Sequence, residues 1–117
     1  MMTGSAESET PHPSDVVLSA IAHEQRRAVL HALTHADKTR MEVSTLVDRV
    51  SERVRNGEPP DVEHRQRIHT ALHHVHLPKL DSCGMVVYDT ETKQVKNTTG
   101  ELAQELLALI APYDALE

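Results

Sequence analysis

Residues 65–97, RQRIHTALHHVHLPKLDSCGMVVYDTETKQVKN, decide the fold predicted for this chain. The first part carries a long helical pattern, which Gly84 ends in the way glycines commonly end helices. Two short β segments follow at residues 86–89 and 94–97, and the polar turn between them predicts a hairpin. Pro78 lies inside the helical pattern and is expected to kink its last turns.

The rest of the chain predicts further helices around this segment. The spacing of apolar residues indicates helices over 14–21, 23–33 and 44–54, one that begins at Asp61, and a final helix that Pro112 ends. The run at 56–60 is a breaker, and residues 40–43 can form a strand that pairs with the hairpin. The expected N-caps are Ser14, Ser44 and Asp61, with a capping box of Thr98 and Glu101. In the second helix, Glu24, Gln25, Arg26 and Arg27 are expected to face solvent.

Length and composition limit the size of the core and the kind of ligand. The 117 residues form one domain, whose core must come from Val, Leu, Ile and Ala because Tyr88 and Tyr113 are the two Phe, Tyr or Trp residues. Without aromatic platforms for base stacking, single-stranded nucleic acid is an unsuitable ligand. No apolar run reaches the ~20 residues of a membrane-spanning helix, and the polar residues 1–13 are no signal peptide. We therefore expect a cytoplasmic protein with a disordered N-terminal tail.

The charge balance is acidic, with 18 Asp and Glu against 12 Lys and Arg and a formal net charge of -6. DNA-binding domains are mostly basic, because the release of cations from DNA drives their affinity. Surplus acid with few lysines suits a proteome in molar salt, where the Debye length falls to ~3 Å and long-range repulsion is screened. Affinity would then come from hydrogen bonds, shape fit and apolar contact, with salt cations able to bind between carboxylates and phosphates.

The segment HLPKLDSCGMV, residues 76–86, resembles the end of the DNA-reading helix in ArsR-like winged-helix regulators. HVHLPKL, residues 74–80, is similar to haloarchaeal members of that superfamily, and the resemblance covers residues 15–112. It implies a winged helix-turn-helix domain over 14–98 between a tail at 1–13 and a C-terminal dimerisation helix at 99–117. It further implies a homodimeric transcriptional regulator of duplex DNA, in an oxidative or other stress response of a halophilic archaeon. The connection at 56–60 is longer than the turn of a simple helix-turn-helix.

The long helix presents polar side chains suited to base edges. Ile68 and Leu72 share the face that meets the core, so the polar residues point away from it or lie in the first turns. Arginine can fork onto guanine and glutamine onto adenine, while threonine and histidine donate or accept. The predicted groove-reading residues are Arg65, Gln66, Arg67, Thr70 and His74. The alternative is an ordinary solvated helix face.

Phosphate contacts are expected from the hairpin and, by analogy with the fold, from the segment before the third helix. Carboxylates at the hairpin tip, Asp89 and Glu91, oppose such contacts at low salt. Surface cations often do nothing specific, which is the alternative at each position. The candidate phosphate-binding residues are Lys93, Lys96, Arg40 and Thr39.

Histidine and cysteine offer two sensing hypotheses. His69, His73 and His76 recur at i, i+4 and i+7, a spacing that can hold a transition metal. The favoured alternative is that these histidines pack, hydrogen-bond or contact DNA. His31 and His35 form a weaker pair. The single cysteine, Cys83, cannot form an internal disulfide; it is a candidate redox sensor, with core filling as the alternative. We expect neither a metal nor a cofactor.

The final helix is the predicted dimer interface, because the stripe of Leu102, Leu106, Leu109 and Ile110 is too apolar to face water. Docking onto its own core is the alternative. No Gly-rich phosphate loop, nucleophile elbow or paired-carboxylate site supports catalysis, so no enzyme activity is expected. Two rivals to the DNA-binding interpretation remain: a winged-helix module that binds proteins, and a metal-responsive regulator.

Overall fold

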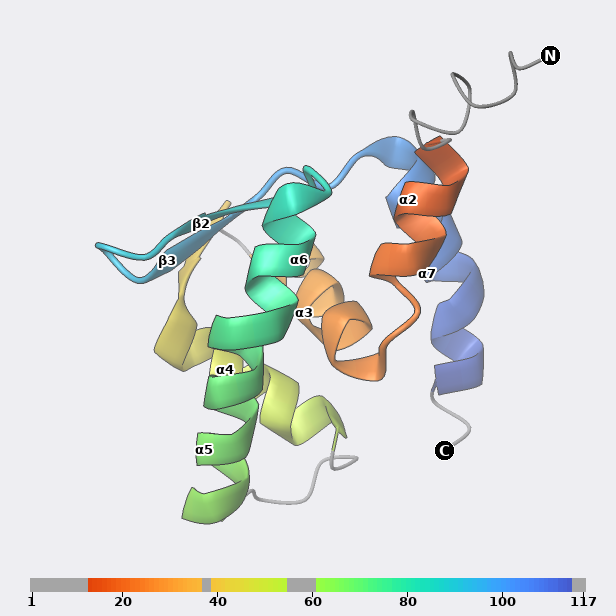
Figure 1. Ribbon diagram of the computed structural model, residues 1–117. Helices are drawn as coiled ribbons and strands as arrows, with labels where there is room; N and C mark the ends of the chain where they lie inside the picture. The colour runs from red at the N-terminus through yellow and green to blue at the C-terminus, as the bar shows by residue number, and fades with distance from the viewer. Residues whose placement is uncertain (1–12, 37–38, 55–60, 115–117) are drawn as a thin grey trace, which may run out of the picture.

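The computed structural model describes residues 13–36, 39–54 and 61–114. The protein is mainly helical with one small three-stranded sheet, as the sequence predicted (Figure 1). The predicted breaker at 56–60 and residues 1–12 of the predicted tail lie outside the described residues. In chain order the elements are α2 (Pro13–Ala20), α3 (Glu24–Thr34), β1 (Arg40–Glu42), α4 (Val43–Val54), α5 (Val62–Ala71), the π-helix η1 (Leu72–His76), α6 (Leu77–Ser82), β2 (Val86–Asp89), β3 (Gln94–Asn97) and α7 (Glu101–Asp114).

The N-caps predicted for two helices are wrong. Helix α2 begins at Pro13 and α4 at Val43, so Ser14 and Ser44 lie inside their helices. Proline suits the first helical position because the missing N–H has no partner there in any case. The N–H of Val43 donates to the Lys93 carbonyl at 2.9 Å, so the hairpin satisfies the first backbone donor of α4.

Both ends of the last helix also differ from the prediction. Helix α7 begins at Glu101 and continues through Pro112 to Asp114. Thr98 therefore lies three residues before the helix and is not its N-cap, so the predicted capping box with Glu101 is wrong. The Thr98 hydroxyl instead donates to the Gly84 carbonyl at 2.9 Å. Proline costs the last turn one hydrogen bond but keeps a helical φ, which explains why α7 does not end at Pro112.

The sheet has the strand order β1-β3-β2, and both pairings are antiparallel. The hairpin strands have the predicted bounds, and β1 pairs with β3, which confirms the short strand expected near residue 40. Met41 lies opposite Val95, and both side chains are buried on the core side. Arg40 lies opposite Lys96, and both are exposed. The sheet therefore has an apolar inner face and carries two cations side by side on its outer face.

Gly84 ends α6 as predicted, with a left-handed φ of 78°. The Met85 N–H donates to the Leu80 carbonyl and the Gly84 N–H to the Asp81 carbonyl, both at 3.0 Å. These two bonds form a Schellman motif, in which the residue after the C-cap must adopt a left-handed conformation. The chain thereby turns from the helix directly into β2, with Leu80 and Met85 both buried at the turn.

We expect Gly84→Ala to destabilise the protein by about 1–2 kcal/mol, because an L-residue pays a steric penalty at positive φ. No atom lies within 4 Å of an added Cβ, so the loss reports backbone strain alone. Gly100→Ala is the matched control, since Gly100 also has open space but no positive φ. Chemical denaturation measures both; equal losses in the two variants would contradict the role given to Gly84.

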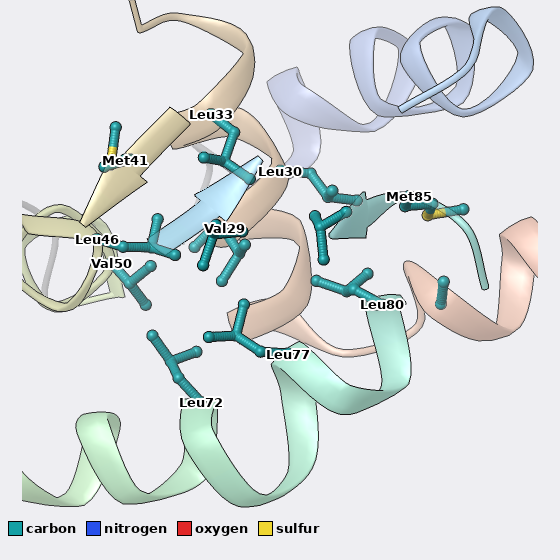
Figure 2. Close-up of a cluster of buried hydrophobic side chains, with 14 of the residues drawn as sticks. Val29, Leu30, Leu33, Met41, Leu46, Val50, Leu72, Leu77, Leu80 and Met85 are labelled. Carbon is teal, nitrogen blue, oxygen red and sulfur yellow. The ribbon is translucent and has the colours of Figure 1, made fainter. Parts of the chain in front are cut away.

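The core lies between α3, α4, the long helix α5–η1–α6 and the inner face of the sheet, as Figure 2 shows. Leu30, Leu46, Leu72, Leu77 and Leu80 are all fully buried. Each such leucine contributes roughly 1.5–3 kcal/mol through removal of its side chain from water. This aliphatic core, built without Phe or Trp, holds the long helix and the hairpin in a fixed relation.

Helices α2 and α7 lie side by side at one flank of the molecule (Figure 1). Ala103 and Leu107 of α7 are buried in the core cluster together with Ala20 of α2. Within the ranges that the structure describes, no helix is long and apolar enough to cross a bilayer.

Candidate nucleic-acid interface

The long helix begins at an N-cap that the sequence predicted. A carboxylate oxygen of Asp61 accepts a hydrogen bond from the His64 N–H at 2.7 Å. The cap satisfies one of the helix's first free donors and places a negative charge at the positive end of the helix dipole. The polar residues that follow are thereby held in helical register from the first turn.

A π turn interrupts this helix just before Pro78. The N–H of Leu77 donates to the carbonyl of Leu72, five residues earlier, over the span of η1. Pro78 has no N–H and cannot continue the regular α pattern, so the wider turn accommodates the break. The interruption predicted from Pro78 thus takes the form of a π turn, which contains one residue more than a regular helical turn. Every side chain after Leu72 is therefore rotated relative to a regular α-helix.

Four of the five predicted groove-reading residues lie exposed along α5 and η1. Gln66, Arg67, Thr70 and His74 line one open groove on the solvent side of the helix. The guanidinium of Arg67 forms an exposed ion pair with Glu63 at 3.3 Å, one turn earlier. Such a pair is weak, so a phosphate or base can displace the carboxylate at little cost.

The fifth residue, Arg65, is held by another helix. Its Nε donates to the Asp48 carboxylate of α4 at 2.7 Å, and its side chain is 40% exposed. The ion pair joins α4 to α5 and fixes the guanidinium near the start of the long helix. Arg65 is therefore partly engaged in stabilising the helix pair, which the sequence could not show because its partner is 17 residues away.

The outer face of the sheet carries the predicted phosphate-binding cations. Arg40 and Lys96 lie directly opposite each other on β1 and β3, and Lys93 is at the hairpin tip with a φ of 58°. Among the residues that the structure describes, the side chains of these three form no ion pair or hydrogen bond. Like charges directly opposite in a sheet are destabilising, and a bound anion would offset the repulsion. Thr39 is exposed beside them, and its carbonyl accepts from the Asn97 N–H at 2.8 Å.

Asp89 holds the hairpin tip in shape. Its carboxylate accepts from the backbone N–H groups of Glu91 at 2.9 Å and Thr92 at 3.2 Å. The bonds from Thr92 and then Glu91, with a smaller contribution from nearby Arg40, lower the pKa of Asp89. The sequence interpretation treated Asp89 as a charge opposing phosphate; the structure gives this carboxylate a structural role in the turn.

Two contacts that the sequence interpretation missed tie the hairpin to the long helix. The Tyr88 hydroxyl and the His73 Nδ1 lie 2.6 Å apart, and the Tyr88 N–H donates to the Asp81 carboxylate at 2.9 Å. Burial raises the pKa of Tyr88, which keeps the phenol neutral. The sequence offered one signal for the contact between Tyr88 and His73: a tyrosine on the inner face of a strand that follows a helix rich in histidine. These two contacts therefore hold the hairpin against the long helix.

The three-histidine metal hypothesis fails on geometry. His69 and His73 lie near each other, with ring centroids 6.4 Å apart, but the π turn rotates His76 into the core. Across the described ranges, no group of three His, Cys, Asp or Glu side chains can hold a metal. The pair His31 and His35 also stacks, at 6.2 Å, and the His35 ring contacts the His31 carbonyl.

His76 instead joins a cluster at the junction of α2 and α3. Its ring centroid lies 4.3 Å from that of His23, and its Nδ1 lies 3.2 Å from Nη1 of Arg26. Arg26 also donates to the carbonyls of Ala20 and Ser19 at the end of α2. Burial, then the neighbouring His23 and Arg26, lowers the pKa of His76 to about 4.

The prediction that Arg26 and Arg27 face solvent is wrong. Both are half-buried, and Arg27 donates to the Ile21 carbonyl at 2.8 Å. A helix leaves its last carbonyls without intrahelical partners, and the two guanidiniums satisfy those of α2. Cys83 is half-buried and packs against the core, which agrees with the core-filling alternative.

The predicted dimerisation stripe on α7 is half covered. Leu106 and Ile110 pack partly against the core, whereas Leu102 and Leu109 are 43% and 68% exposed. Leu18 of α2 is also exposed. Both the docking of α7 onto its own core and a free apolar edge are therefore present on the same helix.

The fold defines a small, mainly helical domain with a three-stranded antiparallel sheet, an arrangement compatible with a winged-helix-like fold. The chain belongs to the family described as "Domain of unknown function (DUF7344)", whose sequence profile matches residues 18–96. The matched range runs from α2 to β3 and includes the long helix and the hairpin. Comparison with curated proteins and with solved structures found no match.

Proposed function

We propose that this protein is a sequence-specific transcriptional regulator that binds duplex DNA as a homodimer through a winged helix-turn-helix. In this proposal α3, α4 and the long helix α5–η1–α6 are its three helices, and the β2–β3 hairpin is the wing. The stress response of a high-salt archaeal cytoplasm, which the family resemblance suggests, is the expected setting.

The observation that carries the proposal is the continuity of an exposed polar helix with a hairpin that carries two exposed lysines, Lys93 and Lys96. Gln66, Thr70 and His74 offer hydrogen-bonding groups along the solvent face of the helix. The hairpin that follows is fixed to the same helix through Tyr88 and carries Lys96 beside Arg40. A helix that enters the major groove needs such a neighbour to set its register on the phosphates.

A protein-interaction module is the second candidate, and the exposed leucines favour it. Leu18, Leu102 and Leu109 offer an apolar surface, and the net charge of -6 suits a protein partner better than DNA. The two candidates differ in what the long helix contacts. Duplex binding that depends on Arg67 and His74 supports the first and is not expected of the second.

We expect the protein to select a duplex from a randomised pool in molar KCl, where charge attraction is screened. Arg67→Ala and His74→Ala should each weaken binding to that duplex by about tenfold, within the roughly 1–3 kcal/mol of one good base contact. Fluorescence anisotropy measures the dissociation constants.

Arg53→Ala is the matched control for the loss of one surface arginine, because Arg53 is exposed on α4. The control should bind as the unchanged protein does. Binding that disappears at high salt, or that ignores both helix substitutions, would remove the long helix from the interface.

A further inference from the structure

The π turn brings one apolar side chain out to solvent. In a regular α-helix, Val75 would follow Ile68 by seven residues and Leu72 by three, and would join their buried stripe. In the structure Val75 is 54% exposed, whereas His76 is 4% exposed. The helix thus buries a polar ring and exposes a valine, the reverse of the usual preference.

Val75 lies in a defined setting on the proposed DNA-reading face. It lines the same open groove as Thr70, Ala71 and His74. Ala71 and Val75 are four residues apart and line the same groove. The groove therefore combines two small apolar side chains with a hydroxyl and an imidazole beside them.

This combination matches one feature of the major groove. The edge of an A·T pair carries the C5-methyl of thymine next to the thymine O4 acceptor, and small apolar side chains contact that methyl. Thr70 and His74 can hydrogen-bond to the adjacent base edges, while an exposed valine has no such capacity. Exposure of Val75 to water alone brings no favourable free energy, whereas contact with a thymine methyl would remove the side chain from water.

We propose that Val75 contacts a thymine C5-methyl and makes the protein specific for an A·T pair at that position. This inference rests on the proposed function, because it requires the long helix to lie in the major groove. The discrimination comes from apolar contact, so it persists in molar salt, where contacts between charges are screened.

Deoxyuridine provides the test, since it differs from thymidine only in lacking the C5-methyl. Each thymidine of the duplex selected from the randomised pool is replaced in turn by deoxyuridine. At one or two positions the unchanged protein should lose about fourfold in affinity, the value of one buried methyl. Val75→Ala should bind the original duplex about fourfold more weakly and should no longer distinguish thymidine from deoxyuridine there.

Val62→Ala is the matched control, because Val62 is an exposed valine of the same long helix outside this groove. It should retain the discrimination of the unchanged protein, and circular dichroism of all variants verifies folding. The assignment to Val75 is overturned if the unchanged protein binds every deoxyuridine duplex as tightly as the original, or if Val75→Ala still distinguishes thymidine from deoxyuridine. Either result leaves DNA binding itself intact. Failure to select any duplex overturns the proposed function and this inference with it.

Discussion

Replacing both Leu102 and Leu109 by glutamate is expected to convert the proposed homodimer into a monomer. The two leucines are exposed on α7 and lie on one side of the helix, seven residues apart. Burial against a second copy would remove them from water, and two carboxylates in the same place would repel their symmetry mates across a two-fold axis. Light scattering in molar KCl measures the change in mass.

The same double variant should weaken binding to a duplex with two half-sites by about 100-fold or more. A dimer binds its second half-site with a high effective concentration, which a monomer lacks. The two half-sites are expected about 34 Å apart, one helical turn, or a multiple of that distance. Affinity for a single half-site should stay unchanged, because the substitutions leave the long helix and the hairpin intact.

A double variant with the same added charge controls for electrostatic repulsion from DNA. Gln104→Glu combined with Ala108→Glu also adds two carboxylates to α7, but on its exposed polar side. This protein should remain dimeric and bind the two-site duplex as before. Equal losses in the two double variants would show that charge, and not dimer contact, caused the effect.

The parts of the fold that the sequence predicted well are those with a local chemical cause. Asp61 caps the long helix and Gly84 ends it, and both act through residues at most four positions away. The hairpin strands follow from β-forming residues on each side of a polar turn, and their predicted bounds hold. Such signals depend on backbone conformation within one turn, which a single sequence carries.

The parts that the sequence could not show depend on tertiary contacts or on a small change of helical phase. Arg26 looks like a solvent-facing residue by periodicity, but the end of α2 lies beside it and offers carbonyl acceptors. Arg65 likewise meets Asp48 of another helix. Pro78 signalled a kink, yet not its form, and the π turn reassigned His76 from the outer face to the core. The extra residue of the π turn thus buries His76 away from His69 and His73, which contradicts the metal hypothesis, and it exposes Val75.

The buried position of His76 leads to an expected dependence of stability on pH. Its pKa is lowered to about 4 in the folded protein, against about 6.5 in the unfolded chain. Between these values the unfolded chain binds a proton that the folded protein does not, so the free energy of unfolding decreases as pH falls. The contribution of His76 to the free energy of unfolding is fully present above pH 6.5 and is lost as the pH falls towards 4. The loss is about 3 kcal/mol, because a difference of one pKa unit corresponds to about 1.36 kcal/mol.

Chemical denaturation of the unchanged protein and of His76→Gln at pH 7.5 and pH 4.5 isolates this contribution from that of the carboxylates, which titrate in both proteins. Glutamine keeps an acceptor for the Arg26 guanidinium but has no proton to gain, so the variant should lose about 2–3 kcal/mol less over this interval. His74→Gln is the control, because His74 lies two residues away but is exposed. It should show the full pH dependence, since His76 and its buried surroundings are unchanged in this variant. Equal losses in the unchanged protein and in His76→Gln would mean that His76 is readily protonated in the folded state, which would contradict the burial that the π turn gives it.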